Sequence, residues 1–94
     1  MTEGKYNEMT ERALSGYKFY WEKFEQCDYL IGIYGEKEDL VIGYESSRLV
    51  LSELGELLKI AGIVIDTKWY EEKRAEIRKR VDDNAEHYKE QFGE

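Results

Sequence analysis

The sequence predicts a single α+β domain made of an N-terminal helix, a β-hairpin and a C-terminal αα-hairpin. Apolar residues repeat with a helical period before residue 28 and again after residue 46, which predicts helices at both ends. Between them, two short apolar runs flank a polar stretch, which is typical of a β-hairpin. A chain of 94 residues has the length of one domain, so we treat residues 1–94 as a single unit.

The N-terminal helix is predicted from residue 2 to residue 27, where apolar or aromatic residues recur at steps of three and four. These residues are Tyr6, Met9, Ala13, Tyr17, Tyr20, Phe24 and Cys27. Gly16 lies on the same stripe, and its missing side chain would let another element approach closely.

The β-hairpin is predicted from the apolar runs 29–34 and 40–44, with a loop over residues 35–38. Three glycines and four β-branched residues between positions 31 and 43 favour strands, because both types are poor in helix interiors. An all-α three-helix bundle is the alternative. A long helix starting near Glu36 would also be periodic, with its stripe at Leu40, Tyr44, Ser47, Leu51, Leu54, Leu58 and Ala61.

The C-terminal αα-hairpin is predicted over residues 47–91. Its first helix would start at Ser46 or Ser47 and end at Gly62, which suits a left-handed C-terminal cap. Asp66 or Thr67 would cap the next helix, whose stripe is Tyr70, Ile77, Val81, Ala85, Tyr88 and Phe92.

Part of this region resembles a known family. The segment 54–77 has a leucine-rich helix that ends at Ala61-Gly62, an apolar turn at 63–65, and a returning helix led by Trp69-Tyr70 with lysine and arginine behind it. It resembles the short C-terminal helical hairpins called SHOCT modules, and the resemblance implies an αα-hairpin.

Composition excludes several classes of protein. No apolar run approaches the roughly 20 residues of a membrane-spanning helix, and the N-terminus has no signal-peptide pattern, so we expect a cytoplasmic protein without a membrane partner. A single cysteine, Cys27, excludes an internal disulfide. The net charge of −7, from 14 basic and 21 acidic residues, argues against direct binding of nucleic acid.

The sequence carries no strong catalytic or metal-binding pattern. Asp83 and His87 lie four residues apart on a predicted helix, but the paired histidines or cysteines of tight metal sites are missing. Cys27 falls on an apolar stripe, where cysteine usually serves as a small core residue. We therefore expect no enzyme activity, no catalytic residue, no metal and no cofactor.

The charge distribution leads to our main functional hypothesis. The segment 28–65 has seven acidic and three basic residues, and Glu36, Glu38 and Asp39 would gather at the hairpin tip. Together with the aromatic residues Trp21 and Trp69, they are the predicted partner-binding residues. The expected function is a small acidic interaction protein that binds and blocks a partner protein, of the type made by phages and mobile elements. One mode would be nucleic-acid charge mimicry, with a basic nucleic-acid-binding protein as the partner.

A sponge that sequesters a nucleotide-like phosphorylated small molecule is the alternative function. Trp69 or Tyr70 would stack on the base, while Arg74 and Arg78, which are four residues apart, would hold the phosphate. Intrahelical ion pairs are a competing role for these arginines.

We also expect a homodimer. Thirteen aromatic residues are many for the core of one small domain, so some should be covered by a second copy. The aromatic side chains in question are Phe19, Trp21, Trp69, Tyr88 and Phe92.

Overall fold

The structure, a computed structural model, describes residues 3–93 and contains four helices in that range. These are α1 (Glu3–Tyr34), α2 (Glu38–Ile60), α3 (Thr67–Asp83) and the short α4 (Ala85–Phe92). The N-terminal helix is therefore confirmed, and it continues for seven residues beyond the predicted end.

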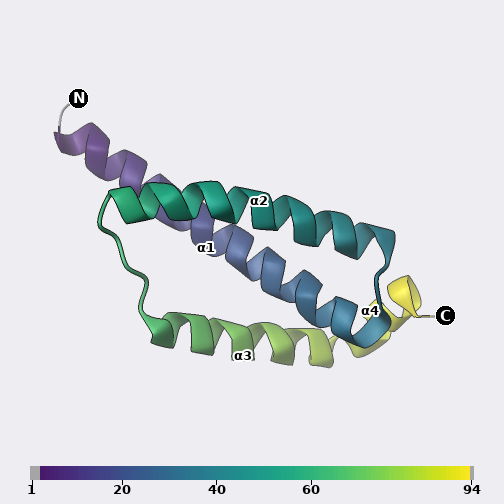
Figure 1. The fold of residues 1–94 in the computed structure, drawn as a ribbon. Coiled ribbons are helices and arrows are strands. Elements are labelled where there is room, and N and C mark those ends of the chain that lie inside the picture. The colour runs from purple at the N-terminus through teal and green to yellow at the C-terminus, as the bar shows by residue number, and fades with distance from the viewer. Residues whose placement is uncertain (1–2, 94) are drawn as a thin grey trace.

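The four helices form an elongated, thin body of 54 × 25 × 17 Å. α1 is the central element, and both α2 and α3 pack against it. α2 and α3 run in opposite directions, joined by the connection 61–66 at one end (Figure 1). The αα-hairpin predicted over residues 47–91 differs from the structure, because α2 already begins at Glu38, the helix after the turn breaks at Asn84, and α2 and α3 pack mainly on α1 instead of on each other.

The predicted α+β class with its β-hairpin is wrong, because residues 3–93 contain helices and no strand. Residues 29–34 are the last turns of α1, residues 38–44 start α2, and only 35–37 connect them. Gly43 explains part of the error, since it is a close-packing position inside a helix: a Cβ there would lie 2.8 Å from the Cys27 Sγ. The alternative, an all-α arrangement with a helix starting near Glu36, is closer to the structure.

Local signals explain where the helices begin and end. Gly35 has a φ of 87°, a left-handed conformation that suits glycine, and it turns the chain between α1 and α2. Gly62 follows the end of α2 and has a φ of 74°, the left-handed conformation that the sequence predicted for the C-terminal cap. Asp66 caps α3 as predicted, because its carboxylate accepts a hydrogen bond of 2.9 Å from the Lys68 backbone N–H.

The chain bends again at Asn84, between α3 and α4. The Asn84 side-chain amide donates to the Arg80 carbonyl at 2.8 Å, which satisfies a carbonyl at the end of α3. α4 then brings the aromatic rings of Tyr88 and Phe92 to the edge of the core, where Phe92 lies 6.2 Å from the Tyr34 ring.

The core lies along α1. Its buried cluster combines residues from three helices, with partly buried aromatic rings around them. The cluster consists of Trp21, Leu30, Leu40, Ile77 and Val81. On the α2 side, Phe24 stacks on Tyr44 with ring centroids 4.6 Å apart, and Gly16 leaves room for Leu54. The close approach predicted for Gly16 is therefore confirmed.

Candidate protein-interaction surface

Exposed apolar side chains gather on the side of α2 opposite its buried residues, and the C-terminal end of this side, at Leu57 and Ile60, borders α1 at Met9 and Ala13. Ile42, Leu49 and Ile60 project within about 20° of one another at the 100° per residue of a helix, and Leu57 lies next to them. The buried residues Leu40, Ser47 and Leu58 lie on the opposite side of the same helix. We call Ile42, Leu49, Leu57 and Ile60 the α2 stripe.

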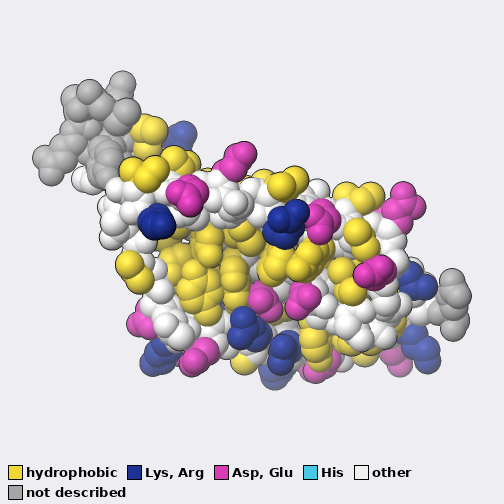
Figure 2. Space-filling view, viewed as in Figure 1, with side chains coloured by type: hydrophobic (Ala, Val, Ile, Leu, Met, Phe, Trp, Pro, Cys, Tyr) yellow, Lys and Arg dark blue, Asp and Glu magenta, His cyan; other side chains and the backbone are white. Residues whose placement is uncertain are grey.

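The α2 stripe is open to solvent. Its side chains are 57% exposed at Ile42, 59% at Leu49, 55% at Leu57 and 79% at Ile60. Single exposed apolar residues are common on proteins, but here four lie along one helical face over a length of about 27 Å at 1.5 Å per residue. Figure 2 shows hydrophobic and acidic side chains along the upper edge of the molecule, where α2 runs.

All five acidic residues of α2 project toward the same half of the helix as the stripe. Geometry at 100° per residue places its two basic residues, Arg48 and Lys59, about 100° away on the flank. The carboxylates are Glu38, Asp39, Glu45, Glu53 and Glu56. Within residues 7–93, Glu45 is the one of the five with an ion pair, to Arg48 at 2.8 Å. At the same spacing Glu53 projects within 20° of Ile42 and Ile60, and the other four carboxylates lie within about 60° of them, so acidic and apolar side chains are interspersed on this surface.

The predicted carboxylates Glu36, Glu38 and Asp39 lie at one end of this surface. Glu36 is in the connection between α1 and α2, and the other two form the first turn of α2, where their charge stabilises the helix N-terminus. All three are exposed. Their surroundings differ from the prediction, because they stand at a helix start and not at the tip of a hairpin.

The predicted aromatic residues Trp21 and Trp69 lie on a different side of the molecule. Trp21 is buried, and its ring centroid is 5.4 Å from that of the half-buried Trp69 and 5.0 Å from that of Tyr70. The Lys18 ammonium lies 5.1 Å from the Trp69 ring centroid. The structure therefore does not bring the tryptophans together with the predicted carboxylates.

The residues of the alternative phosphate-binding hypothesis are engaged with α1. The Arg74 guanidinium donates to the Glu25 carboxylate at 3.3 and 3.4 Å and lies over the Trp21 ring. Arg78 lies over the Tyr29 ring, at 5.4 Å from its centroid. Both arginines already have protein partners, although the partners lie on α1 and not within α3 as the competing ion-pair role supposed.

The residues considered for chemistry are dispersed. Cys27 is buried beside Gly43, and burial raises the pKa of its thiol, the opposite of what a nucleophile needs. His87 is exposed on α4, with its ring edge-on to Tyr88 at 5.3 Å. No group of three or more metal-ligand side chains occurs within the residues that the structure describes.

The basis for the predicted homodimer changes with the structure. Of the five aromatic residues named for it, Phe19 is 60% exposed, whereas the rings of Trp21, Trp69, Tyr88 and Phe92 pack on the core of one chain. The homodimer stays a prediction, with Phe19 as the aromatic residue that a second copy would cover.

The sequence prediction missed the α2 stripe. Its signal was present, because Ile42, Leu49 and Ile60 repeat at intervals of 7 and 11 residues, both of which return to the same helical face. Assigning residues 40–44 to a strand separated Ile42 from the others. Glu53 and Glu56 lie inside the helix that was predicted to end at Gly62, but only the carboxylates near the expected hairpin tip were considered as partner-binding residues.

Comparison of the chain with protein-family models, with curated proteins and with solved structures gives no match. None of the helices within the described residues is both long enough and apolar enough to cross a membrane.

Proposed function

We propose that the protein is a small non-catalytic interaction protein whose outer α2 face binds a basic, amphipathic segment of a partner protein. The observation that carries the proposal is the coincidence of the exposed α2 stripe with five carboxylates and no basic residue on that face. A partner of matching chemistry would offer an apolar helix face or ridge with lysine or arginine interspersed among its apolar residues.

Each part of the surface would contribute differently. Burial of Leu49 and Ile60 would supply affinity, since apolar area removed from water is stabilising at roughly 25 cal/mol per Å². The carboxylates at 53 and 56 would orient the partner and accelerate its approach in a salt-dependent way. A second copy of this chain is a poorer occupant, because pairing two α2 faces would bring like charges together.

Such binding would block the partner where its basic surface also serves nucleic acid. Lysine and arginine clusters are the usual phosphate-binding surfaces of nucleic-acid-binding proteins, and a row of carboxylates competes for the same charges. This is the mode of action that we propose, with α2 in place of the predicted hairpin tip as the acidic element.

The first experiment uses a synthetic helical peptide with leucines on one face and flanking lysines, titrated into isotope-labelled protein and followed by NMR. We expect shifts of the amides around residues 42, 49 and 60, and weaker binding as salt is raised. A peptide with glutamate in place of lysine is the control. Equal binding of both peptides, or shifts confined to α3, would contradict the proposal.

The second experiment identifies whether a cellular partner uses the same face. A photo-crosslinking residue at position 49 is compared with one at position 75, which is exposed on α3. The proposal expects a protein crosslinked from position 49 alone, and its loss in Glu53→Lys/Glu56→Lys. The matched control Glu71→Lys/Glu72→Lys makes the same charge change on α3 and should leave the crosslink intact. Crosslinks of equal yield from both positions would count against the α2 face.

A further inference from the structure

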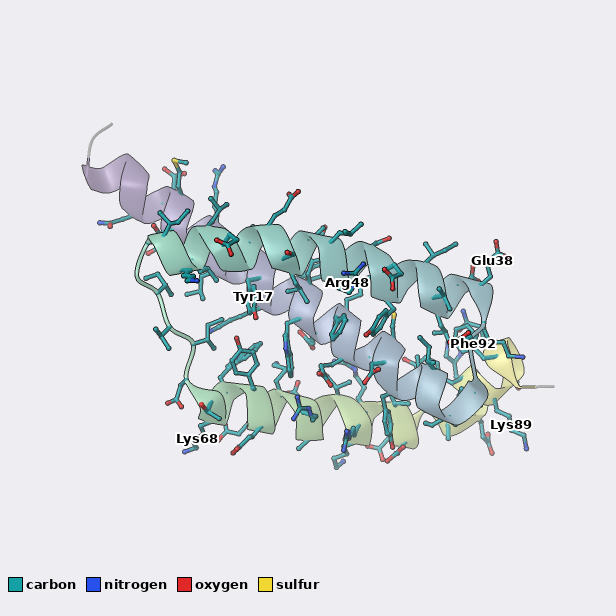
Figure 3. The ribbon with its side chains drawn as sticks, in the orientation of Figure 1. Tyr17, Glu38, Arg48, Lys68, Lys89 and Phe92 are labelled. Atoms are coloured by element: carbon teal, nitrogen blue, oxygen red, sulfur yellow. The ribbon has the colours of Figure 1, made fainter. Side chains whose placement is uncertain are left out.

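A cavity of about 330 Å³ lies at the end of the molecule where α2 connects to α3. Residues of α1, α2, α3 and the connection line it: Tyr17, Gly55, Leu58, Lys59, Gly62, Ile63, Val64, Ile65 and Tyr70. Its volume falls at the lower end of the range of small-molecule sites, so it suits a ligand of few atoms. Figure 2 shows a hollow lined with hydrophobic side chains between the two helices, and Figure 3 places Tyr17 in that space.

Two hydroxyl groups give the cavity a hydrogen-bond donor. The Tyr70 hydroxyl donates to the Tyr17 oxygen at 3.1 Å, in a partly buried position. Two hydroxyls joined by one hydrogen bond keep one proton free, and residues 7–93 offer it no acceptor. The Tyr70 phenol is neutral at pH 7 already at its ordinary pKa, and burial and the hydrogen bond with Tyr17 raise that pKa further. The pair can therefore donate to a ligand without repelling an anion.

Lys59 is the single charged residue among those that line the cavity. It has no carboxylate partner within residues 7–93, unlike Lys68, Lys73 and Lys79 of α3. The backbone carbonyls at the end of α2 are also satisfied, since those of residues 57, 58 and 59 accept from the N–H groups of residues 61, 63 and 62. A negatively charged ligand group would thus meet a free ammonium and few unpaired acceptors.

We propose that this cavity binds a small apolar carboxylate, such as a medium-chain fatty acid or an aryl acid. The apolar wall formed by Leu58, Ile63 and Ile65 takes the hydrocarbon part. The carboxylate accepts from the tyrosine pair and neutralises Lys59. This site lies on the inner side of α2, away from the α2 stripe, and it is independent of the proposed protein-binding function.

The test is an NMR titration of the whole protein with octanoate, and with octanol and octylammonium as probes of the same chain length. Octanoate should shift the amides of residues 17, 55 and 65 and bind several-fold more tightly than either neutral or cationic probe. Equal binding of octanol would overturn the recognition of a carboxylate. Shifts confined to the separate groove lined by Met9, Ala13 and Leu57 would overturn the location.

Variants separate the roles of the lining residues. Tyr17→Phe/Tyr70→Phe should weaken octanoate binding by about fivefold, the value of one lost hydrogen bond near 1 kcal/mol, whereas Tyr17→Phe alone leaves the Tyr70 hydroxyl as a donor. Lys59→Gln should weaken octanoate and leave octanol unchanged, whereas Lys89→Gln, a matched change at the opposite end of the molecule (Figure 3), should alter neither. Gly55→Leu should fill the cavity, because a Cβ there lies 3.7 Å from the Tyr17 ring. Retention of full octanoate affinity in both Tyr17→Phe/Tyr70→Phe and Lys59→Gln would refute the proposal.

Discussion

The two faces of α1 hold their neighbours by different means. Toward α2 the contact is close and largely apolar, with Gly43 against Cys27 and the Phe24 ring stacked on Tyr44. Toward α3 the contact is polar at its margins, where Arg74 pairs with Glu25 and Arg80 pairs with Glu22. The difference indicates that α1 and α2 form the primary unit of the fold. α3 is attached by apolar contacts centred on Ile77 and Val81 and by a set of replaceable polar contacts.

The polar contacts of α3 are worth comparing with its apolar contacts. Arg80 donates to the Glu22 carboxylate at 3.2 Å and to the Gln26 side-chain oxygen at 2.8 Å, and Tyr29 donates to Asp82 at 2.8 Å. All three contacts are exposed, so each contributes little. Ile77, by contrast, is 1% exposed in the centre of the interface.

The largest effect should come from Ile77. Ile77→Ala should lower the free energy of unfolding by about 2–5 kcal/mol, the cost of a large apolar side chain removed from a core. Urea denaturation measures it, and hydrogen exchange should show α3 opening before α1 and α2. Ile60→Ala, the same change at an exposed position, should cost less than about 0.5 kcal/mol. If the amides of all helices lost their protection from hydrogen exchange together, α3 would be no less firmly held than α2, contrary to the difference described above.

The close contact on the α2 face should give the next effect. Gly43→Ala introduces a Cβ 2.8 Å from the Cys27 Sγ, and such overpacking costs about 1–3 kcal/mol, partly offset by about 1 kcal/mol of helix propensity.

A double-mutant cycle with Cys27→Ala separates the two terms. In the Cys27→Ala background the sulfur is gone, so Gly43→Ala should become stabilising. Additive effects of the two substitutions in thermal denaturation would show that the helices are not in close contact at this point.

A smaller effect is expected from the ion pair between α1 and α3. Arg74→Gln should cost about 1 kcal/mol or less, because Glu25 is largely buried but the guanidinium is half exposed. The cost should fall as salt increases. Lys68→Gln removes the fully exposed pair with Glu72 within α3 and serves as the control, with no measurable change expected. A larger loss of stability for Lys68→Gln than for Arg74→Gln would contradict the conclusion that contacts with α1 hold α3 in place.

The last prediction concerns the chemical reactivity of the buried Cys27 thiol and involves no substitution. Because burial raises the pKa of its thiol, less thiolate is present at neutral pH than for a free cysteine. Alkylation by iodoacetamide should be much slower in the native protein than after denaturation, and its rate should rise with pH and with urea. Alkylation at the same rate in both states would show that the contact between α1 and α2 is open.

Helices with an undisputed period were predictable from the sequence. The α1 helix, the cap at Asp66 and the turn at Gly62 follow from local chemistry, and the structure confirms each of them. The predicted α1 stripe matches the buried face only in part, since Met9 is 57% exposed and the buried Trp21 lies off the stripe. The helical structure of the segment 29–44 was not predictable, because local residue preferences and tertiary packing favour different structures there. Glycine disfavours a helix interior by about 1 kcal/mol, a penalty that burial of Leu30 and Leu40 against the other helices can exceed.

The surfaces were harder to predict than the elements. The net negative charge of the segment 28–65 indicated an acidic region, and α2 is that region. The set of carboxylates that share a side with exposed apolar residues depends on α2 being one continuous helix. The cavity at Tyr17 and Tyr70 brings together residues 53 positions apart, which no local pattern reveals.

The thinness of the molecule has an evolutionary consequence. A body 17 Å across in its shortest dimension leaves few positions beyond the reach of solvent, and the buried side chains in the described range are seven apolar residues and Ser47. Exposed positions tolerate most substitutions at little cost in stability. Selection on the fold alone therefore acts on a small fraction of the chain, and related sequences can diverge quickly while keeping the same arrangement of helices.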